Sequence, residues 1–101
     1  MIKNITEKEF KNETEGKKVL LQFHATWCGP CKMLGMVINE FDKEGIIDIL
    51  RIDVDEAGEL ANQFKIFSVP TLVILDNGNE VKRISGFMPK EELERRVTEN
   101  E

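Results

Sequence analysis

Segments of strand character and segments of helical character alternate along this chain of 101 residues, and that alternation limits the folds it can adopt. The run 71–75 consists of β-branched and aliphatic residues, which is typical of a strand covered on both faces. The turn sequence at 76–79, Asp-Asn-Gly-Asn, predicts that the following strand returns antiparallel. In all, strands are predicted over residues 2–5, 19–23, 47–54, 71–75 and 81–85.

The segments between the strands have helical spacing. Thr6 and Glu9 are spaced as a capping box, which predicts a short helix that ends near Gly16. Pro30 suits the first turn of a longer helix, for which Gly45 is a natural stop. The buried face of this longer helix is predicted to carry residues at i, i+3, i+4 and i+7, namely Leu34, Val37, Ile38 and Phe41.

Two more helices complete the order β-α-β-α-β-α-β-β-α. One covers residues 57–64, and the last opens at Pro89 and turns Leu93 and Val97 inward. The early alternation predicts parallel strands with helices on both faces, and the terminal hairpin makes the sheet mixed. The predicted fold class is therefore α/β, a three-layer sandwich around a central mixed β-sheet. Because no linker or repeat interrupts it, residues 1–101 are predicted to form one domain.

Both cysteines of the chain lie in the stretch Trp-Cys-Gly-Pro-Cys at residues 27–31. A disulfide across so short a loop stabilises a fold by roughly 2 kcal/mol, compared with about 4.7 kcal/mol for a 100-residue loop. A bridge that adds so little stability is better explained as a reactive pair. The spacing therefore makes thiol–disulfide exchange the leading hypothesis.

The cysteine pair falls where a predicted strand leads into a predicted helix. The free N–H groups and the positive dipole end of that helix would stabilise a thiolate on Cys28. Cys31 lies about one turn deeper in the helix, so it should be less exposed. Cys28 is therefore predicted to be the attacking nucleophile and Cys31 the resolving thiol.

The charge balance excludes some classes of partner. The chain has 14 basic and 19 acidic residues, a net charge of −5, which argues against binding to nucleic acid or to anionic membranes. The N-terminus has no apolar stretch of signal-peptide length, and the most apolar run, residues 66–75, is too short to span a bilayer. We therefore expect a cytoplasmic protein, in which a Cys-x-x-Cys pair is catalytic or metal-binding rather than structural.

Several motifs in register resemble the thioredoxin family. Trp-Cys-Gly-Pro-Cys-Lys at 27–32, Val-Pro-Thr at 69–71, Asn-Gly at 77–78 and Gly86 occur in thioredoxin order and spacing. The resemblance runs from about residue 2 to residue 97 and implies the thioredoxin fold. It implies reduction of protein disulfides through a reversible Cys28–Cys31 pair, without another cofactor. It also implies a monomer whose partners are a thioredoxin reductase and disulfide-containing client proteins.

The resemblance further implies a substrate site beside the cysteines. Pro70 should follow a cis peptide bond, which would expose the Val69 backbone to an extended substrate that pairs as an added strand. A shallow apolar surface around Cys28 would then consist of Trp27, Gly29, Pro30, Val69, Pro70 and Gly86. For Trp27 this docking role is favoured over ordinary core filling.

The sequence departs from the family pattern near this site. Gln22 replaces a buried aspartate that assists proton transfer at the resolving thiol, and an amide cannot accept a proton at neutral pH. Arg51 aligns with a lysine that usually neighbours that aspartate, and without a carboxylate partner we expect it to extend to solvent. Met36 replaces a helix-kinking proline, so the helix should be straighter. His24 replaces a tryptophan, and a partly buried neutral side chain is favoured over one that titrates and tunes Cys28.

Three alternatives to a cytoplasmic reductant remain open. A metal or iron–sulfur site would have only Cys28, Cys31 and His24 as soft ligands, whereas a closed zinc site needs four. A secreted oxidase or isomerase of the same fold commonly has other residues between the cysteines. A binding module without redox turnover would fit the presence of Gln22, but retention of both cysteines argues against it.

Overall fold

A five-stranded β-sheet forms the middle layer of the computed structural model, which describes residues 1–99. All five predicted strands are present. In sheet order they are β1 (Ile2–Asn4), β3 (Asp48–Asp53), β2 (Lys18–His24), β4 (Thr71–Asp76) and β5 (Asn79–Ser85).

The sheet is mixed, as predicted. However, β4 is already antiparallel to its neighbour β2, whereas the terminal hairpin requires a reversal only between β4 and β5. β1 and β2 run parallel to β3, whereas β4 runs antiparallel to β2, and β5 runs antiparallel to β4. The predicted hairpin is confirmed, and both central residues of its turn, Asn77 and Gly78, have positive φ angles. Because β4 starts opposite the end of β2, with Thr71 paired to Phe23, Pro70 lies at the same sheet edge as the cysteines.

Helical segments lie where the apolar spacing predicts them. The capping box is present, because the Glu9 carboxylate accepts a hydrogen bond from the Thr6 backbone N–H at 2.9 Å. The first turn after it is a 3₁₀ helix, η1, which leads into a short α-helix. The helical segments are η1 (Glu7–Glu9), α1 (Phe10–Thr14), α2 (Gly29–Asp42), α3 (Gly58–Gln63) and α4 (Lys90–Thr98).

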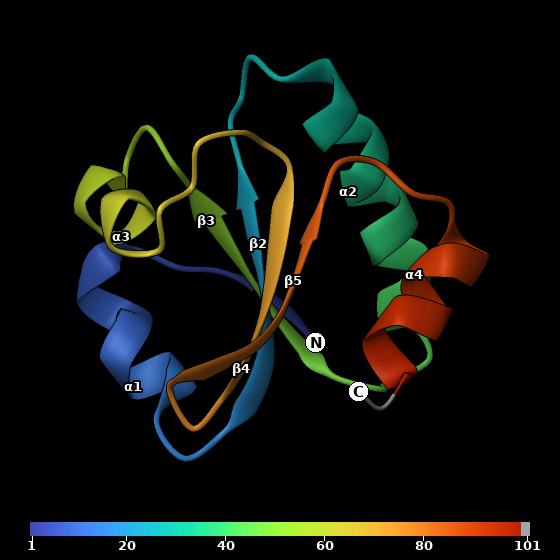
Figure 1. The fold of residues 1–101 in the computed structure, drawn as a ribbon, viewed down its shortest axis with the longest axis horizontal. Coiled ribbons are helices and arrows are strands. Elements are labelled where there is room, and N and C mark those ends of the chain that lie inside the picture. Colours follow the sequence, from blue (N-terminus) through green and yellow to red (C-terminus); the bar gives the residue numbers. More distant parts are fainter. Residues whose placement is uncertain (100–101) are drawn as a thin grey trace.

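Helices cover both faces of the sheet, which confirms the three-layer α/β sandwich. Figure 1 shows α1 and α3 on one side of the sheet and α2 and α4 on the other. Successive β2 side chains alternate between these layers: Leu21 packs with the α1 and α3 side, and Leu20 packs against Leu34 of α2 and Leu93 of α4. Gln22 and His24, which have the parity of Leu20, therefore lie on the α2 side.

The long helix α2 is unbroken from Gly29 to Asp42. Three of its four predicted inward residues, Leu34, Ile38 and Phe41, are buried. Residues 25–28 join the end of β2 to the N-terminus of α2, so one short segment connects the sheet core to the cysteine pair. No helix within residues 1–99 is both long and apolar enough to cross a membrane.

Candidate active site

Cys28 and Cys31 form a disulfide at the start of α2, with their Cα atoms 5.2 Å apart. Cys28 is the N-cap residue of the helix, and its Sγ accepts a hydrogen bond from the backbone N–H of Cys31 at 3.2 Å. Pro30, within the first turn, has no N–H to satisfy. The Cys28 sulfur therefore lies at the positive end of the helix dipole, where a thiolate is stabilised.

The two cysteines differ in their surroundings rather than in exposure. Their exposed fractions are 5% and 4%, so the expectation that Cys31 is less exposed does not hold in the disulfide form, where the sulfurs are bonded to each other. Cys28 Sγ lies 3.7 Å from the carbonyl oxygen of Val69, a contact rather than a hydrogen bond because a disulfide sulfur has no proton. Cys31 instead lines a cavity that neither Cys28 nor Val69 lines.

The loop before β4 forms one wall of the site. The Val69–Pro70 peptide bond is cis, as the resemblance implied. Val69 is half-buried and packs against the cluster formed by Ala25 and the two cysteines, and Pro70 is buried. Gly86 is tied to this loop because its backbone N–H donates to the Pro70 carbonyl at 2.9 Å, and its φ of +86° favours glycine.

Apolar side chains next to the cysteines are open to solvent. Trp27 is 70% exposed, so it is not a core residue, and its Nε1–H donates to Asp55 Oδ2 at 2.8 Å. Gly29 and Pro30 are also exposed. Sequence reasoning missed Phe67, which is 90% exposed two residues before Val69. The sequence signal that could have identified it is the presence of an aromatic residue two positions before the Val-Pro motif.

Gln22 and Arg51 form a pair beneath α2. They are directly opposite each other on β2 and β3, and Arg51 Nε donates to Gln22 Oε1 at 2.8 Å. Arg51 Nη2 also donates to the Gly35 carbonyl at 3.0 Å and to Asn39 Oδ1 at 2.9 Å, both on α2. The expectation that Arg51 extends to solvent is therefore wrong. The helix covers that position of β3 and supplies neutral acceptors.

His24 and Met36 lie near this pair. His24 is half-buried, and burial lowers its pKa, although the carboxylate of Asp53 opposes the effect. The histidine is therefore neutral at neutral pH, in line with the favoured interpretation. Met36 is exposed on the unbroken α2, and the predicted straightness of that helix stays a prediction.

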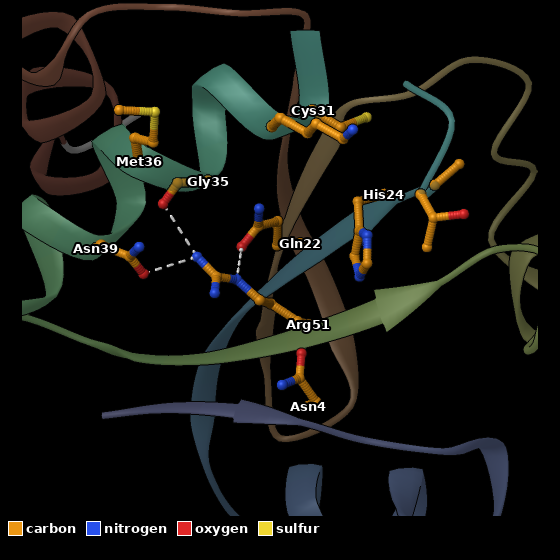
Figure 2. A pocket seen from close by; sticks show the side chains of 11 residues that line it. Asn4, Gln22, His24, Cys31, Gly35, Met36, Asn39 and Arg51 are labelled. Carbon is orange, nitrogen blue, oxygen red and sulfur yellow. Dashed lines mark hydrogen bonds between the residues drawn. The ribbon is translucent and has the colours of Figure 1, made fainter. Parts of the chain in front are cut away.

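A cavity of about 340 Å³ lies next to Cys31, between α2 and the strands. Figure 2 shows Gln22, His24 and Arg51 pointing into it from the sheet, while Cys31 and Gly35 border it on α2. Three of the 11 lining residues are basic in type and none is acidic. Nowhere in residues 1–99 do three or more His, Cys, Asp or Glu side chains group in a way that could hold a metal ion.

Comparison with known proteins places this geometry in a family. Residues 1–99 match the family model of thioredoxin. Thioredoxins of Staphylococcus aureus strains Mu50 and MW2 are each 43% identical over 94 residues, covering 91% of this chain and 90% of the relative. A solved Asn-to-Gln mutant of a thioredoxin from Halobacterium salinarum NRC-1 is similar with a TM-score of 0.82 and 31% identity, covering 91% of this chain and 83% of that one.

The chain belongs to the thioredoxin family. Its fold is the thioredoxin fold, and its function is that of a thiol–disulfide oxidoreductase acting on protein disulfides. Cys28 and Cys31 form the redox-active disulfide of this thioredoxin. The Gln22–Arg51 pair lies behind these cysteines.

Proposed function

We propose that this thioredoxin reduces client proteins in the cytoplasm and is reduced in turn by a thioredoxin reductase, with residues 1–101 acting as one domain and one monomer. Cys28 is the nucleophile and Cys31 the resolving thiol. The observation that carries these roles is the position of Cys28 as the N-cap of α2, where its sulfur accepts a backbone N–H. The positive end of the helix dipole stabilises a thiolate at this position.

The reaction proceeds in two exchanges. The Cys28 thiolate attacks one sulfur of the client disulfide, which forms a mixed disulfide and releases the other client sulfur as a thiolate. The Cys31 thiolate then attacks the Cys28 sulfur, which closes the Cys28–Cys31 disulfide and releases the second client thiolate. Two electrons pass to the client, whose thiolates take protons from solvent. The sulfur pair carries these electrons, so the cycle needs no other cofactor.

Client docking is proposed to use the loop before β4. The Val69 carbonyl lies 3.7 Å from Cys28 Sγ, so an extended client segment that pairs with this backbone brings its own disulfide next to the nucleophile. Apolar side chains of the client would lie on the surface around Cys28. That surface consists of Trp27, Gly29, Pro30, Val69, Pro70 and Gly86, with exposed Phe67 beside it.

Trapping and labelling test these roles. In the reduced protein, mild alkylation should modify Cys28 before Cys31, as read by peptide mass spectrometry. Cys31→Ser should accumulate mixed disulfides with insulin, because no thiol remains to resolve them, whereas Cys28→Ser should accumulate none. Preferential labelling of Cys31 would reverse the assignment. Failure of Cys31→Ser to trap any client would instead favour a docking module without redox turnover.

A further inference from the structure

Arg51 determines which end of the Gln22 amide faces the cysteines. A guanidinium has only N–H donors, so the amide oxygen of Gln22 must face it, and it does so at 2.8 Å from Arg51 Nε. The amide NH₂ is left to point the other way. Figure 2 shows the Gln22 nitrogen on the side of Cys31 and its oxygen on the side of Arg51.

The orientation is fixed by packing as well as by this hydrogen bond. Gln22 is only 2% exposed, and the guanidinium is held on α2 by the Gly35 carbonyl and the Asn39 side chain. Gly35 lies one turn after Cys31. A Cβ placed on it would lie 3.9 Å from Gln22 Nε2, so the amide nitrogen is directly beneath the turn that begins at Cys31.

The surroundings of the cavity favour negative charge on Cys31. The charged or titratable lining groups are His24 from β2, Arg51 from β3, and Lys32 and Cys31 itself from α2. His24 is neutral at neutral pH because burial lowers its pKa, so Lys32 and Arg51 supply the permanent charge. The acids near this region lie outside the cavity lining. Asp42 interacts electrostatically with Arg51, and Asp53 and Glu56 interact electrostatically with His24.

We propose that, once the disulfide opens, the Gln22 amide held by Arg51 donates a hydrogen bond to the Cys31 sulfur and stabilises its thiolate. Gln22 is then a catalytic residue and Arg51 a positioning residue. The site lowers the pKa of the resolving thiol in place of supplying a base to deprotonate it. The Cys31 proton passes to solvent through the cavity, whose rim includes the exposed side chains of Lys32 and Asn39.

This inference rests on the proposed role of Cys31 as the resolving thiol. The thiolate that Gln22 stabilises is the species that attacks the Cys28 sulfur, forms the Cys28–Cys31 bond and expels the client thiolate. A lower Cys31 pKa increases the thiolate fraction at neutral pH. Because the Gln22 amide does not titrate, and His24 is already neutral above its lowered pKa, the resolving rate near and above neutral pH should rise with pH until Cys31 itself is ionised and then level off.

The test measures the Cys31 pKa directly in a Cys28→Ser background, where Cys31 is the one thiol of the chain, by thiolate absorbance near 240 nm. Gln22→Leu removes the donor, and Gln22→Glu keeps an acceptor for Arg51 but presents a carboxylate oxygen toward the cavity. Both should raise the Cys31 pKa by about one unit, equivalent to tenfold less thiolate at a given pH below it. In Gln22→Glu, repulsion between the carboxylate and the thiolate contributes to the rise, so an unchanged or lowered pKa in Gln22→Leu, which removes the donor without adding a charge, would overturn the proposal.

A double-mutant cycle distinguishes two roles of Arg51: orienting the Gln22 amide and supplying positive charge near Cys31. Arg51→Met should raise the Cys31 pKa more in the Gln22 protein than in Gln22→Leu, where only the loss of its positive charge remains and there is no amide to orient. Arg51→Lys, which also offers only donors, should restore most of the wild-type value. Arg95→Met, the matched loss of charge at an exposed arginine of α4 that does not line the cavity, should change nothing. An Arg51→Met effect of the same size in Gln22→Leu would show that Arg51 acts through charge alone.

A failure of this inference can be distinguished from a failure of the proposed function. If Cys31→Ser traps clients while the Gln22 variants leave the Cys31 pKa unmoved, the thiol assignment stands and the amide donor is wrong. If Cys31→Ser traps nothing while the pKa moves as expected, the hydrogen bond exists but Cys31 is not the resolving thiol.

Discussion

At the scale of single residues, the properties of the site follow from what each side chain can donate or accept. Gln22 can present either end of its amide, and a fixed guanidinium selects the end that faces Cys31. The Cys28 sulfur is paired with a backbone N–H at the helix start. Once the disulfide opens, the proposal gives the two sulfurs different donors, a backbone N–H of α2 for Cys28 and the Gln22 side chain of β2 for Cys31.

His24 makes the site sensitive to mild acid. Burial lowers its folded pKa below the unfolded value of about 6.5, so its contribution to stability is complete above that value and is lost as pH falls through the folded pKa. Between pH 7.5 and 5.5, the free energy of unfolding should therefore fall more in the wild type than in His24→Gln. Urea melts at both pH values measure this difference, and parallel pH dependence in the two proteins would contradict it.

At the scale of elements, α2 carries both the cysteines and the acceptors that hold Arg51. Gly35 supplies one acceptor through its backbone, so a side chain at this position is not needed for the hydrogen bond. The glycine is in the interior of the helix, where it is less favourable than alanine. An alanine at this position would therefore give a more stable helix than the glycine does.

Gly35→Ala should stabilise the protein by about 0.5–1 kcal/mol, the helix-propensity difference between the two residues. The added Cβ would meet Arg51 Nη2 at 3.7 Å and Gln22 Nε2 at 3.9 Å, which are ordinary van der Waals contacts. Urea denaturation measures the stability, and a destabilised variant would mean that the guanidinium needs the open space above it.

The elements show what sequence patterns can and cannot predict. The strands and helices were predictable because apolar spacing reports which faces are buried, as for Leu34, Ile38 and Phe41 on α2. The direction of β4 was not, since a strand covered on both faces has the same pattern in either direction. Arg51 was expected to extend to solvent because no carboxylate partner was in view, and only the position of α2 reveals that this face of β3 is covered.

The candidate site was predictable to the extent that its motifs are local. The cysteine pair and the cis bond before Pro70 follow from short stretches with family spacing. The Gln22–Arg51 hydrogen bond joins residues 29 apart, and it depends on strand register and on neutral acceptors from a helix. Side-chain chemistry alone made a solvent-exposed arginine the simpler interpretation, because the sequence shows no carboxylate partner for it.

At the scale of the whole molecule, two hydrophobic cores hold the fold, one on each face of the sheet. The cysteines belong to neither. They pack in a small separate cluster with Ala25, and their disulfide joins residues three apart within a single segment. The redox centre is therefore attached to a framework whose stability comes from elsewhere, which allows the disulfide to open and close without unfolding the protein.

Reduction should therefore leave the protein folded and lower its free energy of unfolding by about 2 kcal/mol or less, the value for so short a loop. Urea melts with and without dithiothreitol measure the difference, and the double variant Cys28→Ser with Cys31→Ser should match the reduced wild type. As a core control, Leu93→Ala removes a fully buried side chain that packs between α4 and the sheet, and it should cost about 2–5 kcal/mol. Loss of the near-ultraviolet circular dichroism spectrum on reduction alone, without urea, would show that the disulfide and not the two cores maintains the fold.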